Sequence, residues 1–222
     1  MILGWSIMLL FTNSNYKIED ISLHQIGFWI GLISLILLLI NEIIFIKNIN
    51  FKNLYYSFFG LIYISLSWAL LTYLRSNYNF DDSSIEMGKY IILLIICSIW
   101  INDTMAYIVG SFIGKTPLTK ISPKKTWEGT IGGIILAIVV IGAIGFFINK
   151  ENWNTVFTFS AIAAICAVAG TFGDILESKL KRMANIKDSG SILPGHGGFL
   201  DRFDSLLIAT PFVWLLIVLV LK

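Results

Sequence analysis

TVFTFSAIAAICAVAGTFGDIL, residues 155–176, is followed after Glu177 by SKLKRMANIKDSGSILPGHGGFLDRFD, residues 178–204, and this change from apolar to charged sequence decides the fold. The first part is long enough to cross a bilayer, because a hydrocarbon core of about 30 Å needs about 20 apolar residues in a helix. The 27 residues of the second part include five Lys or Arg, three Asp and four Gly. Glycine lets the backbone approach a ligand closely, so a charged loop of this kind suits phosphate binding at a membrane face.

The composition of the whole chain is that of an integral membrane protein. Of its 222 residues 56% are hydrophobic and 14% are charged, and the mean hydropathy is +0.80. Soluble domains usually carry about 25% charged residues. The two cysteines, Cys97 and Cys166, lie inside apolar segments, which favours buried hydrophobic side chains over a disulfide or a metal site.

Hydropathy predicts an all-α integral membrane protein, a polytopic helical bundle with about seven transmembrane segments. Residues 1–11 are apolar but short; no basic region precedes them, so we do not expect a signal peptide. We expect this segment to be the remnant of a longer N-terminal region. The predicted domains are 1–89, with the N-terminal helices, and 90–222, with the catalytic helices. Six segments are long enough to span: 26–46, 54–74, 90–110, 128–148, 155–176 and 203–221.

Lysine and arginine predict how the helices are oriented, because cytoplasmic loops are enriched in them. Segments 47–53, 111–127 and 177–202 alternate onto one side and hold eleven Lys or Arg, against five on the other side. The loops 111–127 and 177–202 should therefore face the cytoplasm, with the C-terminus outside. A polar cavity should open on the cytoplasmic side, lined by 102–107, 122–129 and 174–204.

Carboxylates near this cytoplasmic side predict a cation site. A carboxylate in a span costs on the order of 3 kcal/mol, so it usually faces a protein interior or a water-filled site. Asp174, Ser178, Lys181 and Arg182 share one face of a helix that continues out of the membrane. Two acids from different helices, Asp174 and Asp201, could share a hard cation such as Mg²⁺, while nearby Lys and Arg bind phosphate.

The loop within residues 110–133 offers a second group of bases. Ser122 and Pro123 resemble a helix cap and a first-turn proline, which would place Lys124 and Glu128 one turn apart. The lysines are consistent with phosphate binding or with a simple positive-inside anchor. His196, in the Gly-rich end of the other loop, could ligate a metal, carry a proton or bind backbone; a structural or substrate-contacting role is favoured.

Three motifs resemble one known family, the phosphatidate cytidylyltransferases, also called CDP-diglyceride synthetases. The longest motif is Ser178-x-Leu180-Lys181-Arg182-x4-Lys187-Asp188-x-Gly190-x2-Leu193-Pro194-x-His196-Gly197-Gly198-Phe199-x-Asp201-Arg202-Phe203-Asp204. The other two are Asn102-Asp103-Thr104-x-Ala106-Tyr107 and Ser122-Pro123-Lys124-Lys125-Thr126-Trp127-Glu128-Gly129. The resemblance covers residues 90 to 220 well, and the first 90 residues only as hydrophobic spans.

The resemblance implies that CTP and phosphatidic acid react to give CDP-diacylglycerol and pyrophosphate. It also implies Mg²⁺, with a second, monovalent ion such as K⁺, a homodimer in the cytoplasmic (inner) membrane, and no nucleic-acid partner. The implied catalytic residues are Asp174, Asp201, Lys181, Arg182 and Arg202. The implied metal ligands are Asp103, Asp174, Asp201 and Asp204. The implied substrate-binding residues are Lys124, Lys125, Ser178, Lys187, His196, Gly197 and Gly198.

Two other classes of function remain open at this stage. A related CTP-dependent membrane enzyme could act on a polyprenol or an ether lipid, although the complete signature points away from both. An ion-coupled transporter would carry charges near the bilayer midplane and show internal repeats. Here the charges crowd one face and no repeat is visible. A CDP-alcohol phosphotransferase would need an aspartate-rich motif that the sequence lacks.

Overall fold

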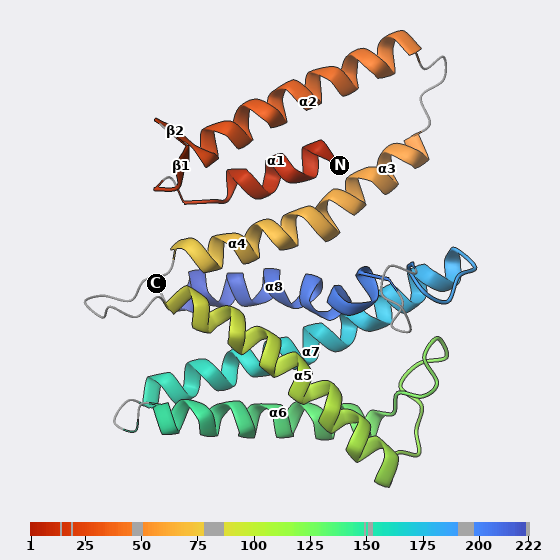
Figure 1. Ribbon diagram of the computed structural model, residues 1–222. Helices are drawn as coiled ribbons and strands as arrows, with labels where there is room; N and C mark the ends of the chain where they lie inside the picture. The colour runs from red at the N-terminus through yellow and green to blue at the C-terminus, as the bar shows by residue number, and fades with distance from the viewer. Residues whose placement is uncertain are drawn as a thin grey trace. The chain divides into compact units, whose positions relative to one another are not determined.

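The computed structural model describes residues 1–13, 15–18, 20–45, 51–77, 87–148, 150, 153–190 and 198–220. The chain divides into two compact units, Met1–Ile91 and Ile92–Lys222, and each is built from helices (Figure 1). The expected all-α membrane fold is confirmed. In the described part of the chain five helices are long and apolar enough to cross a membrane: Tyr55–Ser76, Tyr90–Ile113, Trp127–Ile148, Trp153–Met183 and Leu200–Val220.

The N-terminal unit pairs two helices through a short hairpin and adds a third, longer helical rod. At Gly27 a Cβ atom would lie 2.6 Å from Leu9 Cβ, so this glycine lets the first two helices approach closely. The Asn13 side chain donates a hydrogen bond to the Ser76 carbonyl oxygen at 3.0 Å. The elements are α1 (Ile2–Leu10), β1 (Lys17–Ile18), β2 (Ile21–Ser22), α2 (Leu23–Phe45), α3 (Phe51–Gly60), the π-helix η1 (Leu61–Leu66) and α4 (Ser67–Asn77).

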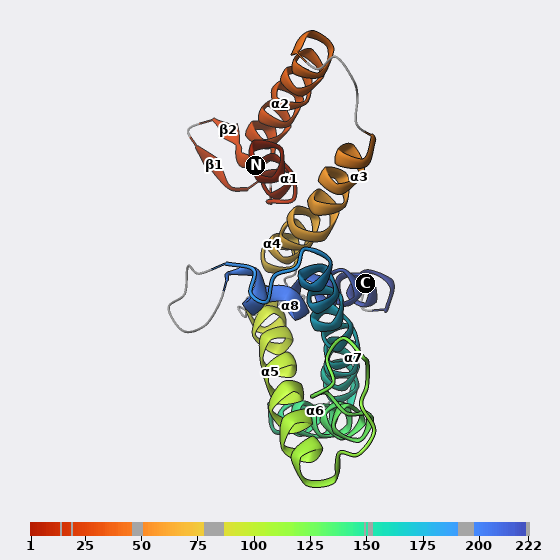
Figure 2. The same cartoon turned by 90° about the vertical axis from the view of Figure 1, so that its right-hand side faces the viewer.

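The C-terminal unit is a bundle of four helices whose polar residues gather at one end. Two glycines bring its helices together there: a Cβ at Gly133 would lie 2.8 Å from the Asn102 carbonyl oxygen, and one at Gly173 would lie 2.6 Å from the Asp204 carbonyl oxygen. The backbones of neighbouring helices therefore contact each other directly beside the polar side chains. The helices are α5 (Met87–Ile113), α6 (Trp127–Ile148), α7 (Trp153–Met183) and α8 (Leu200–Val220), seen from two sides in Figures 1 and 2.

The loop between α5 and α6 is held by its own backbone. The Trp127 N–H donates to the Thr116 carbonyl oxygen at 2.9 Å, and the Leu118 N–H donates to the Lys125 carbonyl oxygen at 2.7 Å. These bonds keep the chain extended up to Thr126, whose hydroxyl accepts a hydrogen bond from the Gly129 N–H at 3.2 Å. The expectation that Ser122 and Pro123 begin the helix is therefore wrong, because Thr126 is the cap.

The remaining boundaries differ little from those expected. The helix α7 continues to Met183, as the shared face of Asp174, Ser178 and Lys181 indicated. The segment expected at 26–46 corresponds to α2, whose described apolar portion, Leu23–Leu38, is shorter than a full span.

Candidate functional site

Two neighbouring cavities lie at the end of the bundle where α5 and α7 finish and α6 and α8 begin. The smaller, of about 410 Å³, is lined mainly by residues that carry polar side chains. The larger, of about 640 Å³, combines charged side chains with apolar residues of α5 and α8. Polar residues of the smaller cavity include Asn102, Ser111, Lys124, Lys125, Thr130 and Thr171. Apolar residues of the larger include Ile96, Ile99, Trp100, Phe203 and Leu206.

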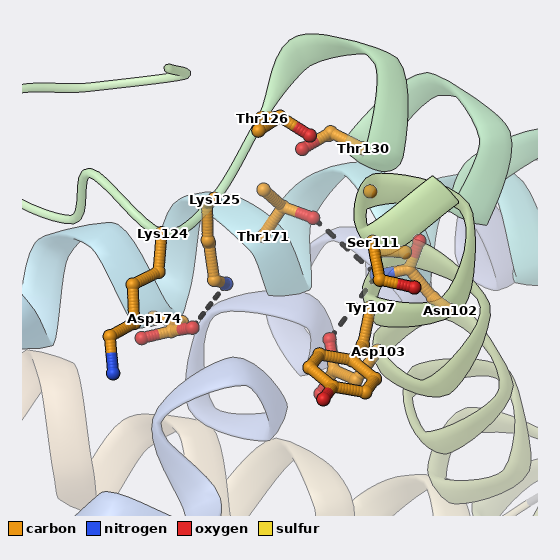
Figure 3. A pocket seen from close by; sticks show the side chains of 12 residues that line it. Asn102, Asp103, Tyr107, Ser111, Lys124, Lys125, Thr126, Thr130, Thr171 and Asp174 are labelled. Carbon is orange, nitrogen blue, oxygen red and sulfur yellow. Dashed lines mark hydrogen bonds and ion pairs between the residues drawn. The ribbon is translucent and has the colours of Figure 1, made fainter. Parts of the chain in front are cut away.

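Asp103 and Asp174 line both cavities and so form a shared wall. Asp103 comes from α5 and accepts a hydrogen bond from the Asn102 amide at 3.3 Å. The same amide lies 3.5 Å from the Thr171 hydroxyl on α7, as Figure 3 shows. Asn102 is buried, and its contact with Thr171 links α5 to α7 next to Asp103.

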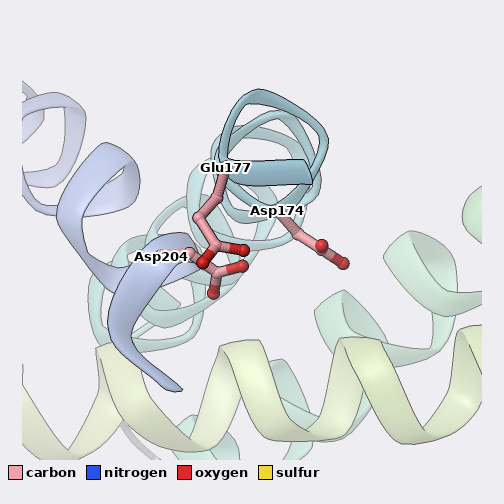
Figure 4. Close-up of side chains that lie close together, drawn as sticks. All are labelled: Asp174, Glu177 and Asp204. Carbon is pink, nitrogen blue, oxygen red and sulfur yellow. The ribbon is translucent and has the colours of Figure 1, made fainter. Parts of the chain in front are cut away.

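Three carboxylates near this wall form an acid cluster, which we define as Asp174, Glu177 and Asp204 (Figure 4). One oxygen from each lies within 4.8 Å of the other two. Asp174 and Glu177 are three residues apart and so share a face of α7, while Gly173 lets the start of α8 bring Asp204 close. Glu177 is 1% exposed, and its Oε1 has no hydrogen-bond partner among the described residues.

Such a buried carboxylate oxygen, facing two further acids, suits a cation. An uncompensated buried charge is costly, and hard cations such as Mg²⁺ prefer oxygen ligands. The donor set of the acid cluster therefore fits a divalent ion.

Two lysines contact the acid cluster from different elements. The Lys125 ammonium, on the loop before α6, forms an ion pair with Asp174 (Figure 3). The Lys181 ammonium, on α7, lies 2.5 Å from Glu177 Oε2 and 2.6 Å from Asp201 Oδ1. Lys125 lines the smaller cavity and Lys181 the larger. Each cavity thus holds one ammonium group that is paired with the cluster.

Asp201 ties the start of α8 to the chain that follows α7. Its Oδ2 accepts hydrogen bonds from the Ser189 N–H and hydroxyl, both at 2.8 Å, and from the Gly198 N–H at 2.7 Å. Its Oδ1 pairs with Lys181. Asp201 lines the larger cavity but lies outside the acid cluster.

Most residues expected at the site line the two cavities. These are Asp103, Lys124, Lys125, Asp174, Lys181, Asp201, Arg202 and Asp204. Ser178 lies beside them and donates to Asp174 Oδ1 at 3.3 Å. Lys187 is exposed, and Arg182 donates to the Ile186 carbonyl oxygen at 3.5 Å; neither is among the residues that line these cavities. His196 and Gly197 lie outside the described residues.

Sequence reasoning missed Glu177 and misplaced Glu128. Glu177 was not among the expected site residues, although its spacing of three residues from Asp174 puts it on the same helix face. Glu128 was expected to face Lys124. Instead its carboxylate accepts hydrogen bonds from the N–H groups of Lys115 and Thr116 at 3.2 Å and so closes the base of the loop.

Comparison with known proteins gives one consistent result. The model of the cytidylyltransferase family matches residues 1–220. The chain is 38% identical over 178 residues to the phosphatidate cytidylyltransferase of Rickettsia felis, covering 78% of this chain and 74% of that protein. It is 35% identical over 221 residues to the phosphatidate cytidylyltransferase of Bacillus subtilis, and the match covers 99% of this chain and 77% of that protein. It is 35% identical over 193 residues to the phosphatidate cytidylyltransferase of Staphylococcus aureus, and the match covers 86% of this chain and 72% of that protein. The chain therefore belongs to the cytidylyltransferase family, among the membrane nucleotidyltransferases called phosphatidate cytidylyltransferases.

Proposed function

We propose that this chain transfers the cytidylyl group of CTP to phosphatidic acid, forming CDP-diacylglycerol and pyrophosphate. A lipid phosphate oxygen forms a bond to the α-phosphorus of CTP, and the bond from that phosphorus to the bridging oxygen of the β-phosphate breaks. The observation that carries the proposal is the pair of cavities that share Asp103 and Asp174. A reaction between a polar nucleotide and a lipid needs two differently lined sites that meet at the reacting phosphorus.

The lining of each cavity suggests which substrate it takes. We assign CTP to the smaller cavity, because most of the residues that line it carry hydroxyl, amide or lysine side chains. We assign the phosphatidate headgroup to the larger cavity, where Trp100 and Leu206 offer an apolar border beside Lys181 and Arg202. Both volumes fall within the range of about 300–1,000 Å³ that is usual for small-molecule sites.

The acid cluster suits the cation that such chemistry uses. We propose that Asp174, Glu177 and Asp204 hold Mg²⁺. Asp103 and Asp201, which line the same cavity, are proposed as further ligands of it or of an accompanying monovalent ion such as K⁺. When bound, the cation would neutralise charge on the phosphate groups and so favour their approach.

The protein side chains supply positioning and charge. We assign Lys124 and Lys125, which line the smaller cavity, to the triphosphate, and Lys181 and Arg202, which line the larger, to the lipid phosphate. Arg182 at the end of α7, and Lys187, His196, Gly197 and Gly198 in the segment after it, remain proposed contacts. The attacking phosphate is already anionic at neutral pH, so no strong general base is required, and holding the reactants in line can account for much of the rate.

The site is proposed to face the cytoplasm from the inner membrane, since Lys and Arg are concentrated in the loops that carry it. A homodimer is proposed on the family resemblance alone.

The test is turnover by the purified chain in nanodiscs supplied with CTP, phosphatidic acid and Mg²⁺, with CDP-diacylglycerol detected by mass spectrometry. We expect product with Mg²⁺, no product after chelation with EDTA, and no product from Asp201→Asn. A folded chain that makes no product from phosphatidic acid but does so from a polyprenol phosphate or an ether-lipid phosphate would overturn the substrate assignment. Wild-type turnover by Asp201→Asn would remove that residue from the site.

A further inference from the structure

We propose that Lys125 and Lys181 occupy the acid cluster when no cation is bound and compete with the cation for its carboxylates. Binding of the cation then releases both ammonium groups toward the cavities, where they bind phosphate groups of the substrates. Cation and CTP would therefore promote each other's binding. The proposal rests on the proposed function for the identity of the phosphate ligand, but the competition itself concerns only this chain and the cation.

The backbone of each lysine is fixed, so an exchange would involve the side chains alone. The Lys125 carbonyl oxygen accepts a hydrogen bond from the Leu118 N–H at 2.7 Å, and the Lys125 N–H donates to the Ser122 carbonyl oxygen at 3.1 Å. Lys181 lies within α7. A lysine side chain has a flexible four-carbon stem, which allows its ammonium to change partner without movement of the backbone.

The lysines contact the same carboxylates that a cation would need. Lys125 pairs with Asp174, and Lys181 lies 2.5 Å from Glu177 Oε2. Two of the three members of the acid cluster are thus paired with an ammonium group. Oε1 of buried Glu177, without a hydrogen-bond partner among the described residues, is a separate indication that the cluster receives a ligand.

Charge balance explains why a bound cation would displace the two lysines from the carboxylates. Five carboxylates surround the site: Asp103 and the acid cluster, with Asp201 beside Lys181. Buried charges need compensation, and the two ammonium groups provide part of it. A divalent ion at the cluster would replace that compensation and repel both ammonium groups. The phosphates of CTP, entering the smaller cavity beside Lys125, would then offer them new partners.

If the lysines compete with the cation, removing either lysine should tighten cation binding, whereas removing a residue that binds the cation should weaken it. Replacing either lysine by methionine keeps the apolar stem but removes the charge, so the carboxylates become freer for a cation. We expect Lys125→Met and Lys181→Met to bind Mn²⁺ about tenfold more tightly than wild type without nucleotide, within the range of usual couplings between sites. In wild type CTP should tighten Mn²⁺ binding; by linkage this gain should shrink in both variants.

The experiment is titration of the purified full chain with Mn²⁺, followed by electron paramagnetic resonance, with and without CTP and with no lipid acceptor. Asp204→Asn should weaken binding and so locate the signal at the cluster. Lys120→Met, an exposed lysine on the same loop as Lys125, is the matched control and should leave the affinity unchanged. Lys181→Arg keeps the charge and should not tighten binding.

Unchanged or weaker Mn²⁺ binding by Lys125→Met and Lys181→Met, in samples that melt at the wild-type temperature, would overturn the proposal. If one methionine variant does not fold, the other and Lys181→Arg still decide it. Failure of the competition can be told apart from failure of the proposed function. If the chain makes product from phosphatidic acid but the lysine variants bind Mn²⁺ as wild type does, only the competition is refuted. If the lysine variants bind Mn²⁺ more tightly but no product forms from phosphatidic acid, only the substrate assignment is refuted.

Discussion

Asp201 and Asp204 lie three residues apart on α8 and have different neighbours. Asp201 accepts hydrogen bonds from Ser189 and Gly198 and pairs with Lys181. Asp204 is buried, and its carboxylate faces Glu177 in the acid cluster (Figure 4). At the scale of single residues, cation binding should therefore depend most directly on Asp204 and Glu177.

Replacing Asp204 by Asn should lower Mn²⁺ affinity by at least about tenfold, because metal ligands and their supports contribute on that scale. Turnover should fall with it and recover partly at high Mg²⁺. The measurement is the Mg²⁺ dependence of product formation. Asp20→Asn, which changes an exposed acid of the N-terminal unit, serves as the control. An unshifted Mg²⁺ dependence in Asp204→Asn would contradict the cluster as the cation site.

The sequence predicted most of the charged residues that line the two cavities, but not that Asp201 and Asp204 contact different groups. Asp103, Asp174 and Asp204 could be found from their position at the ends of spans, and Lys124 and Lys125 from their motif. Helical spacing alone could not show that Asp201 faces Ser189 and Asp204 faces Glu177, because that depends on how closely α8 approaches α7 at Gly173. Glu177 was within reach of the same spacing argument that placed Ser178.

At the scale of elements, one carboxylate adds to the backbone hydrogen bonds that hold the loop before α6. Glu128 accepts from two N–H groups, those of Lys115 and Thr116, at 3.2 Å. The cross-loop bond between Leu118 and Lys125 fixes the backbone of Lys125, whose ammonium pairs with Asp174.

Glu128→Gln should raise the KM for CTP several-fold with little change in kcat, because one acceptor oxygen is lost and each net hydrogen bond is worth about 1 kcal/mol. Steady-state kinetics at varied CTP concentration will separate the change in KM from the change in kcat. Lys120→Gln, in the same loop, should leave KM unchanged. A lower kcat at unchanged KM would instead place Glu128 in the chemical step.

Helix contacts near the site should tolerate no added volume. A Cβ at Gly133 would lie 2.8 Å from both the Asn102 carbonyl oxygen and Ala106 Cβ, whereas a Cβ at Gly60 meets nothing within 4 Å. Gly133→Ala should therefore destabilise the fold by about 1–3 kcal/mol, and Gly60→Ala should be neutral or stabilising. Thermal melting in detergent compares the two directly; equal melting temperatures would argue against the close α5–α6 contact.

Hydropathy located the elements well because apolar length is set by the bilayer. The helix α6 was expected at 128–148 and spans Trp127–Ile148. The cap expected at Ser122 and Pro123 was wrong because capping patterns are local, whereas the hydrogen bonds that hold the preceding chain extended involve Thr116 and Leu118 on the other side of the loop.

At the scale of the whole molecule, the membrane orientation can be tested across one helix. Lys120 and Lys150 lie beyond opposite ends of α6, whose 22 residues are about 33 Å long. In a Cys97→Ser background, an impermeant maleimide should label Lys120→Cys in inside-out vesicles and Lys150→Cys in right-side-out spheroplasts. The reverse pattern would place the site outside, and labelling of both from one side would mean that α6 does not cross.

The two cavities could not be derived from the sequence, since their walls come from three or more separate segments. The positive-inside pattern predicted that acids, bases and glycines share one face, and the structure brings them to one end of the C-terminal unit. Which side chains then line which cavity depends on packing that no motif encodes.

The helix α7 carries Asp174, Glu177 and Lys181 on one unbroken rod of 31 residues, about 46 Å long. That exceeds the hydrocarbon core of about 30 Å, because only the apolar segment 155–176, about 33 Å long, matches the core and the last turns of the helix continue beyond it. Glu177 and Lys181 stand on those last turns, whereas Asp201 and Asp204 belong to a different helix. This would put the acid cluster at the level of the lipid headgroups, where a water-soluble reactant and a lipid can meet without either one leaving its own phase.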